Sequence, residues 1–288
     1  MNTATAKAYT TGSVTSRDGT TIGYRQIGRG PGLILLHGAM QAAQSFMRLA
    51  TALSNSFTVY VPDRRGRGMS GPFGYQHGME KELQDLQALV VGTGAQDVFG
   101  LSSGALIALQ ATLFLPTLRK VALYEPPLAV AGVTSPMAWA PRYERELALG
   151  DLAAAMVSCM EGTGDIATIK VPRFILVLLM RLAIRTSASD GKIGNVPLDV
   201  LIRSVHFDIR LAAEIADTVE TFKAAHTEIL LLGGDRSAAY LAPALDALAG
   251  VLPNAKRIEL PGLGHLAADD VGQPERVADI LRPFFSQR

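Results

Sequence analysis

The sequence predicts an α/β protein in which helices cover both faces of a mostly parallel β-sheet. Short, continuously apolar runs of the kind found in buried strands alternate with helical patterns over residues 32–125. Residues 126–226 break this alternation, because they carry helical patterns without a convincing strand, and the alternation resumes at residue 228. The pattern therefore indicates one α/β core that is interrupted by a helical insertion.

The expected elements of the core follow one another in a regular order. After a loose segment over residues 1–11, two short β patterns lead to a hairpin-like turn at Asp18-Gly19. The further expected strands are residues 32–36, 57–62, 97–101, 120–124, 228–232 and 257–260. The expected helices are residues 44–53, 80–91, 105–115, 241–252 and 274–285.

The expected division into domains follows the break in this order. Residues 1–125 and 227–288 should form the core, and residues 126–226 should form a helical cap, or lid, over the carboxyl-terminal edge of the sheet. Open α/β sheets bind their ligands at that edge. We therefore expect the cap to cover the functional site and to set the choice of substrate.

Composition and charge exclude several classes of site. Hydrophobic residues make up 48% of the 288 residues, and the net charge is +1 with scattered lysines and arginines, so no basic stripe indicates a nucleic-acid partner. Cys159 is the only cysteine, which excludes an intrachain disulfide and a thiolate metal cluster. The histidines and carboxylates lack metal-ligand spacing, so we expect no metal site.

The hydropathy pattern predicts a cytoplasmic protein without a membrane partner. The polar N-terminal stretch lacks the apolar core of a signal peptide. The longest apolar run, residues 174–180, is far too short to cross a bilayer. The oligomeric state is left open by the sequence.

A G-x-S-x-G box is the most informative motif of the chain. Gly100-Leu101-Ser102-Ser103-Gly104 lies between the expected strand 97–101 and the expected helix 105–115. Glycines at these positions let the chain turn sharply from strand into helix, so that Ser102 is strained and exposed at the strand tip. A serine hydroxyl becomes a good nucleophile when a neighbouring base takes its proton. Ser102 is therefore the candidate nucleophile.

His265 is the histidine that best suits the role of that base. It follows an expected strand and lies in the glycine-rich segment Gly262-Leu263-Gly264-His265. His37 follows the expected strand 32–36, and we expect it to shape the turn there. The other histidines lack a comparable setting and are expected at the surface or in the cap: His77, His206 and His226.

The chain resembles the α/β-hydrolase superfamily over nearly its whole length. The resemblance rests on His37-Gly38-Ala39-Met40, on residues 63–72, on the G-x-S-x-G turn over residues 100–104 and on the segment that ends at His265. We call residues 100–104 the serine elbow. It implies an acyl-transfer reaction on an ester, amide or thioester, with no cofactor. Ser103, which follows the nucleophile, should supply one backbone N–H to an oxyanion hole, and the resemblance implies that Ala39 supplies the second. The resemblance also implies that residues 63–72 tie neighbouring loops together.

Two acids compete for the third position of a catalytic triad. Asp235 follows the expected strand 228–232, the usual position in the superfamily, but Gly233-Gly234-Asp235-Arg236-Ser237 is shorter than the usual pattern and lacks its proline. Glu125 ends the expected strand 120–124, and two prolines stiffen the backbone after it. The fungal zearalenone lactonases look similar here, since they carry a comparable elbow and a glutamate one strand–helix–strand unit later. We favour Glu125 and keep Asp235 as the alternative.

These features together predict a serine hydrolase that cleaves a carboxylic ester or lactone through an acyl-enzyme on Ser102. The large apolar side chains of the cap predict an uncharged, fairly hydrophobic small-molecule substrate, with Met40, Met137 and Trp139 expected in its pocket. The alternatives are a thioesterase, a C–C bond hydrolase or an acyltransferase that uses the same triad. A ligand receptor with a hydrolase fold and little turnover is an alternative of another class.

Overall fold

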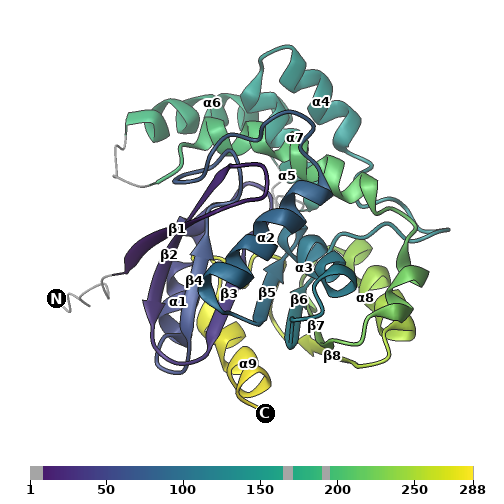
Figure 1. The fold of residues 1–288 in the computed structure, drawn as a ribbon. Coiled ribbons are helices and arrows are strands. Elements are labelled where there is room, and N and C mark those ends of the chain that lie inside the picture. Colours follow the sequence, from purple (N-terminus) through teal and green to yellow (C-terminus); the bar gives the residue numbers. More distant parts are fainter. Residues whose placement is uncertain (1–8, 165–170, 190–194, 288) are drawn as a thin grey trace.

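The computed structural model describes residues 9–164, 171–189 and 195–287, and it shows a central β-sheet flanked by helices (Figure 1). The strands are β1 (Thr10–Thr15), β2 (Thr21–Gly28), β3 (Gly32–Leu36), β4 (Thr58–Pro62), β5 (Asp97–Leu101), β6 (Lys120–Tyr124), β7 (Glu228–Gly234) and β8 (Ala255–Leu260). The helices beside the sheet are α1 (Met47–Leu53), α2 (Met79–Thr93), α3 (Ser103–Phe114), α8 (Ala242–Val251) and α9 (Pro274–Ser286). Short 3-10 helices are η1 (Ala43–Phe46), η2 (Val219–Ala224) and η3 (Ala239–Leu241).

The eight strands form one sheet in the order β1-β2-β4-β3-β5-β6-β7-β8. β2 pairs antiparallel with β1 and with β4, and every neighbouring pair from β4 across to β8 is parallel. Parallel strands all direct their carboxyl ends to the same edge, so the loops after β3, β5, β6, β7 and β8 meet there. The predicted α/β class with a mostly parallel sheet is confirmed.

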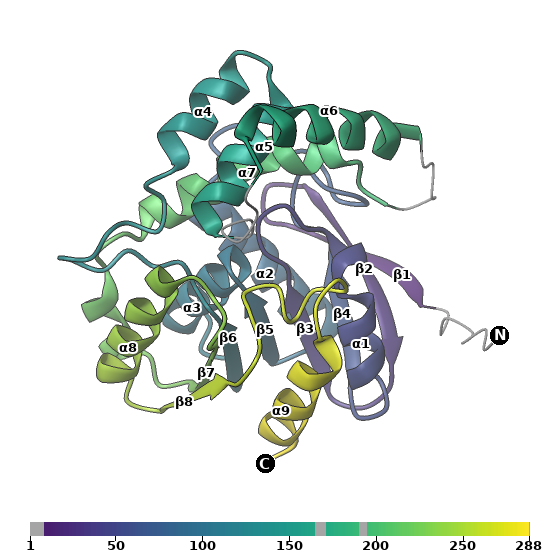
Figure 2. The ribbon, with the colours of Figure 1, turned by 180° about the vertical axis from the view of Figure 1, so that it is seen from behind.

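The parallel strands are buried on both faces because helices pack against each side of the sheet. In β3, Ile34 and Leu36 belong to the core that includes α2, α3 and α8, whereas Leu33 and Leu35 belong to the core that includes α1 and α9. This alternation follows from the two-residue period of a strand. The opposite views of Figures 1 and 2 show the two helix layers on opposite faces. Burial on both faces explains why these strands appear in the sequence as unbroken apolar runs.

The chain leaves the sheet after β6 and builds a second helical layer before it returns at β7. The helices of this layer are α4 (Ala140–Ala148), α5 (Leu152–Thr163), α6 (Arg173–Ser189) and α7 (Leu198–Glu214). Figures 1 and 2 both show these helices as a separate layer at one end of the sheet. The described residues between β6 and β7 contain no strand. Residues 165–170 and 190–194 of the expected cap, like residues 1–8 of the expected loose start, lie outside the described part.

The elements of the core lie within a few residues of their expected positions, and the clearest difference is at the N-terminal edge of the sheet. β1 begins at Thr10, inside the segment expected to be loose, because Thr10 pairs with Gln26 of β2. The expected helix over residues 44–53 is divided into η1 and α1. None of the helices that the structure describes is both long and apolar enough to cross a membrane.

Candidate active site

Ser102 lies at the tip of a strained turn between β5 and α3. Its backbone has φ of 56° and ψ of −121°, a conformation that residues other than glycine rarely adopt. Its N–H donates a hydrogen bond to the carbonyl of Tyr124 at 2.9 Å, which ties the turn to the end of β6. The G-x-S-x-G motif thus has the strand–turn–helix context that presents a serine at the edge of a sheet.

The two glycines of the motif are required by close backbone contacts around Ser102. A Cβ atom on Gly100 would lie 2.4 Å from the carbonyl oxygen of Gly104, and a Cβ atom on Gly104 would lie 2.4 Å from that of Leu36. Both neighbours are backbone atoms, which cannot move aside as a flexible side chain could. The end of β3, the tip of β5 and the first turn of α3 are therefore packed backbone against backbone, and this packing fixes the position of Ser102.

His265 lies in the loop after β8 and contacts an acid at the end of β6. Its Nδ1 atom is 2.7 Å from Oε2 of Glu125, and the two side chains are only 13% and 2% exposed. The Tyr124 hydroxyl donates a hydrogen bond to the carbonyl of Gly264 at 2.9 Å, so the same strand end also holds the histidine loop. His265 and Ser102 line one cavity. The hydrogen bond between a serine nucleophile and its histidine base often shortens only when substrate is bound.

Asp235, the alternative acid, contacts the turn after β8 instead of His265. Its Oδ1 accepts a hydrogen bond from the N–H of Gly262 at 2.6 Å, and the residue is exposed. Gly262 has φ of 73°, so this contact stabilises a left-handed turn. Glu125 has both carboxylate oxygens engaged, because Oε1 accepts a hydrogen bond from the N–H of Gly234 at 2.7 Å. The structure thus brings Glu125, and not Asp235, to His265.

The two residues expected to supply oxyanion donors lie at the same cavity as Ser102. Ser103 is the first residue of α3, where a backbone N–H has no partner within the helix, and Ala39 lies in the turn after β3. That turn is braced by Gln41, whose Oε1 accepts a hydrogen bond from the N–H of Gly38 at 2.7 Å. A Cβ atom on Gly38 would lie 2.9 Å from Cβ of Ser102, so the turn and the serine elbow are in direct contact.

The cavity beside Ser102 is narrow, and the residues between β6 and β7 that line it are mostly apolar. Its volume is about 50 Å³, well below the roughly 300–1,000 Å³ of typical ligand pockets. Besides Ala39, Ser102, Ser103 and His265, it is lined by Tyr240 of η3 and by residues between β6 and β7: Pro127, Met137, Trp139, Cys159, Thr163, Val205, Asp208 and Ile209. Met137 and Trp139 were expected in the pocket. Met40 was also expected there; its backbone is left-handed with φ of 60°, it is not among the lining residues, and it packs both against the cluster that includes Cys159 and Val205 and against Val196 and Leu201.

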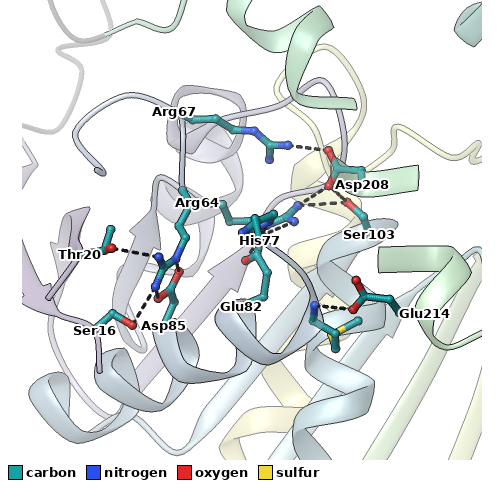
Figure 3. A network of polar contacts seen from close by, with 12 residues as sticks. Ser16, Thr20, Arg64, Arg67, His77, Glu82, Asp85, Ser103, Asp208 and Glu214 are labelled. Atoms are coloured by element: carbon teal, nitrogen blue, oxygen red, sulfur yellow. Dashed lines mark hydrogen bonds and ion pairs between the residues drawn. The ribbon is translucent and has the colours of Figure 1, made fainter. Parts of the chain in front are cut away.

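The arginine-rich loop over residues 63–72 is held by buried ion pairs (Figure 3). The three guanidinium-bearing side chains are at most 3% exposed. Their partners are Glu82 and Asp208 for Arg64, Asp85 and Asp18 for Arg65, and Asp208 for Arg67. Asp63 accepts hydrogen bonds from the N–H groups of Ala43 and Met69 at 2.8 and 3.1 Å. These contacts join the loop to its neighbours, which is the structural role implied by the resemblance.

Asp208 is the charged residue of this site that sequence reasoning did not single out. It lies on α7 in the helical layer between β6 and β7, yet it lines the cavity beside Ser102 and contacts Arg64 and Arg67 of the loop after β4. Burial would raise the pKa of Asp208, but the two guanidinium groups hold that pKa below its usual value, so the carboxylate stays ionised. The sequence carried one signal for this residue: Asp208 lies close to Val205 on the buried side of an amphipathic helix. A charge on that side requires a buried partner.

The remaining histidines do not line this cavity. His37 is buried, and this burial and the charges of Arg67 and Arg64 lower its pKa well below the usual value. Its neutral ring accepts a hydrogen bond from the N–H of Arg64 at 3.2 Å, which fits the shaping role expected for it. His77 was expected at the surface or in the cap, but it is only 2% exposed and belongs to the core. Within the described ranges, no group of His, Cys, Asp and Glu side chains is arranged to hold a metal ion.

Comparison with known proteins gives one family. The family described as "Alpha/beta hydrolase family" matches residues 33–280. A curated relative, the magnesium-chelatase 30 kDa subunit of Rhodobacter capsulatus, is 36% identical over 117 residues, which cover 38% of this chain and 40% of the relative. The match thus spans less than half the length of that relative.

Two solved structures extend the likeness to almost the whole chain. An alpha/beta hydrolase from Sphaerobacter thermophilus has a TM-score of 0.75 and 27% identity, and the alignment covers 96% of this chain and all of the other. The esterase RhEst1 from Rhodococcus sp. ECU1013 has a TM-score of 0.67 and 20% identity, with 96% and 98% of the two chains covered. At 20% identity, the similarity to RhEst1 shows a shared fold and nothing more.

Proposed function

This chain belongs to the alpha/beta hydrolase family, and from that premise we propose that it is a serine hydrolase of carboxylic esters or lactones. The observation that carries the proposal is the contact between Glu125 and His265, 2.7 Å from Oε2 to Nδ1, at the cavity that Ser102 also lines. A carboxylate on Nδ1 leaves Nε2 free to act as a base towards a serine hydroxyl.

The proposed reaction proceeds through an acyl-enzyme. Ser102 Oγ attacks the carbonyl carbon of the ester while Nε2 of His265 takes the hydroxyl proton. Backbone N–H groups of Ser103 and Ala39 stabilise the negative oxygen of the tetrahedral intermediate. His265 then donates its proton to the departing alkoxide, which leaves as the alcohol. Water, activated by His265, attacks the acyl-enzyme in the same way and releases the carboxylic acid.

Glu125 holds the base in its working state during both halves of the reaction. Its carboxylate keeps the proton of His265 on Nδ1 and stabilises the imidazolium that forms when Nε2 takes the second proton. The hydrogen bond from Gly234 to its other oxygen fixes the plane of the carboxylate. The acid therefore needs no movement during turnover.

The cavity supports an uncharged, fairly hydrophobic substrate with a short acyl group. Met137, Trp139 and Val205 present apolar surface, and Asp208, the carboxylate among the lining residues, is neutralised by two arginines. A volume of about 50 Å³ leaves space for only a few water molecules. Short acyl chains are therefore the first substrates to test, and longer ones require the cap to shift.

A substrate panel against wild type and Ser102→Ala tests this function. The panel contains p-nitrophenyl acetate, p-nitrophenyl butyrate, a macrolactone, an acyl thioester and a vinylogous diketone acid for C–C hydrolysis. We expect the short esters to be hydrolysed by the wild type and not by Ser102→Ala. If the thioester or the diketone acid is the better substrate, the bond cleaved is a thioester or a C–C bond and not a carboxylic ester. If no compound of the panel is turned over, a ligand receptor is favoured.

A further inference from the structure

Asp208 reaches from the cap into the core beside the serine elbow (Figure 3). One carboxylate oxygen, Oδ1, accepts hydrogen bonds from the Ser103 hydroxyl at 2.7 Å and from Nη1 of Arg64 at 2.8 Å. The other oxygen, Oδ2, accepts a hydrogen bond from Nη2 of Arg67 at 2.5 Å. The side chain is only 4% exposed. One cap residue thus contacts both the residue after the nucleophile and the arginine-rich loop.

The charges of the core beside the elbow are balanced only when the cap is in place. Arg64 has a core partner, because its Nη2 lies 2.7 Å from Oε1 of Glu82 on α2. Arg67 is 1% exposed, and among the described residues its ion-pair partner is Asp208. An unpaired guanidinium group is costly to bury. The core therefore requires the carboxylate of α7 at this point.

Ser103 links the contact with Asp208 to the proposed reaction. Its backbone N–H is the proposed oxyanion donor, and its side chain is held by Asp208 and by Nη1 of Arg64 at 3.1 Å. An oxyanion donor acts only when it points at the place where the charge develops. The orientation of the first residue of α3 is thus coupled to the position of the cap.

We propose that Asp208 is a positioning residue that holds the cap on the serine elbow and, through Ser103, aligns the oxyanion donor. This inference rests on the proposed function of Ser103 and adds a role for a residue outside the triad. Asp208 does not act on the substrate. It acts through the hydroxyl of Ser103 and through the two arginines that it neutralises.

Asp208→Asn is the informative substitution because it keeps the shape of the side chain. Ser103 and Arg67 donate to different oxygens of the carboxylate, so an amide in the same orientation accepts from only one of them and presents its NH2 group to the other. We expect kcat for p-nitrophenyl butyrate to fall about 10–100-fold, with KM changed by less than about threefold, since alignment in the transition state is affected more than substrate binding. The active sites are titrated with a fluorophosphonate and kcat is expressed per titrated site. A smaller fraction of folded protein therefore does not lower the measured kcat.

Glu214→Gln is the matched control on the same cap helix. Glu214 also links α7 to the core, because its Oε2 accepts a hydrogen bond from the N–H of Met79 at 2.7 Å, but that contact is at the start of α2 and not at the elbow (Figure 3). We expect its kcat to stay within about twofold of wild type. Ser103→Ala retains the backbone N–H and loses the hydroxyl. The double variant Ser103→Ala/Asp208→Asn should have a kcat only slightly below that of the more damaged single variant, because both substitutions break the same contact.

Two results would overturn the inference. One is an Asp208→Asn variant with wild-type kcat per titrated site. The other is a Glu214→Gln variant that loses as much activity as Asp208→Asn, since the effect would then be general loosening of the cap.

Hydrogen exchange separates this inference from the proposed function. If the wild type hydrolyses no ester, the proposed function fails, and deuterium uptake still tests the contact at the elbow. Asp208→Asn should raise the uptake of peptides covering residues 101–106 and α7, whereas Glu214→Gln should leave residues 101–106 unchanged. Unchanged uptake at residues 101–106 in Asp208→Asn would overturn the positioning role.

Discussion

The carboxylate of Glu125 lies 2.7 Å from the ring of His265 although β7 runs between the strands from which these two residues come. Two glycines at the end of β7 make this approach possible. A Cβ atom on Gly233 would lie 3.3 Å from Oε1 of Glu125, and one on Gly234 would lie 2.1 Å from the carbonyl oxygen of Leu263 in the histidine loop. The absence of side chains on these two glycines thus leaves room for the carboxylate of Glu125 to reach the histidine loop past the end of β7.

Ser102→Ala and His265→Ala should each abolish ester hydrolysis without unfolding the protein. Each loss should be on the order of 10⁶ in kcat, because the nucleophile and its base act as one unit, and the double variant should be no slower than the more damaged single variant. The measurements are kcat on p-nitrophenyl acetate and the thermal melting curve of each variant. Turnover by Ser102→Ala within about tenfold of wild type would exclude the serine mechanism.

Glu125→Gln should lower kcat by roughly 10⁴ while the fold is kept, because the amide favours the wrong tautomer of His265 and does not stabilise its imidazolium. Asp235→Asn serves as the matched control, since its carboxylate contacts the N–H of Gly262 and not the histidine. We expect its kcat to fall by about tenfold or less, through altered order of the turn. The reverse ranking of the two variants, measured on the same ester, would move the acid of the triad to Asp235.

Gly104→Ala should both destabilise the protein and remove its activity. The added methyl group would lie 2.4 Å from the carbonyl oxygen of Leu36, and overpacking of this kind costs about 1–3 kcal/mol or more. Gly250→Ala is the control, because a Cβ atom there meets nothing within 4 Å. In α8 it should be neutral or stabilise by up to about 1 kcal/mol. Urea denaturation and ester turnover of both variants check this, and equal stabilities would show that the elbow tolerates a side chain.

The core of the fold could be predicted from the sequence because its strands are buried on both faces. The strands Asp97–Leu101 and Lys120–Tyr124 match their expected bounds, since unbroken apolar runs end there at glycines or at an acid followed by prolines. The start of β1, Thr10 and Thr11, was missed because these residues are polar and exposed, and only pairing with β2 makes them part of a strand. Edge pairing leaves no local pattern of that kind in a sequence.

Sequence patterns identified the candidate site residues that follow strand ends, and they did not identify the residue that reaches the cavity only through the packing of a distant helix. Ser102 and His265 are in motifs, so their approach to one cavity followed from the parallel sheet. Which of Glu125 and Asp235 contacts His265 could be seen only in the structure, because both acids follow adjacent strands and only the direction of each side chain separates them. Asp208 comes to Arg64 across 144 positions of sequence, so the packing of α7 on the core alone brings them together.

Glu82→Gln should make the protein less stable at neutral pH and remove part of its acid sensitivity. Glu82 is 4% exposed and pairs with Arg64, and loss of one partner of a buried pair costs about 3–5 kcal/mol. Burial alone would raise the pKa of Glu82, but Arg64 and His77 hold that pKa well below its usual value. A lowered folded-state pKa means that the pair stabilises the fold above the unfolded-state pKa of about 4.3, and that this stabilisation is lost as the pH falls further.

The free-energy difference between wild type and Glu82→Gln should therefore be largest above about pH 5 and should shrink below about pH 4. Urea denaturation at pH 7, 5, 4 and 3 measures it. Glu80→Gln is the control on the same helix, because Glu80 is exposed and contacts Gln84 one turn away. Its difference from wild type should stay within about 0.5 kcal/mol at every pH. A Glu82→Gln difference that is equally large at pH 3 and pH 7 would contradict the prediction, because the carboxylate charge would then not be what stabilises Arg64.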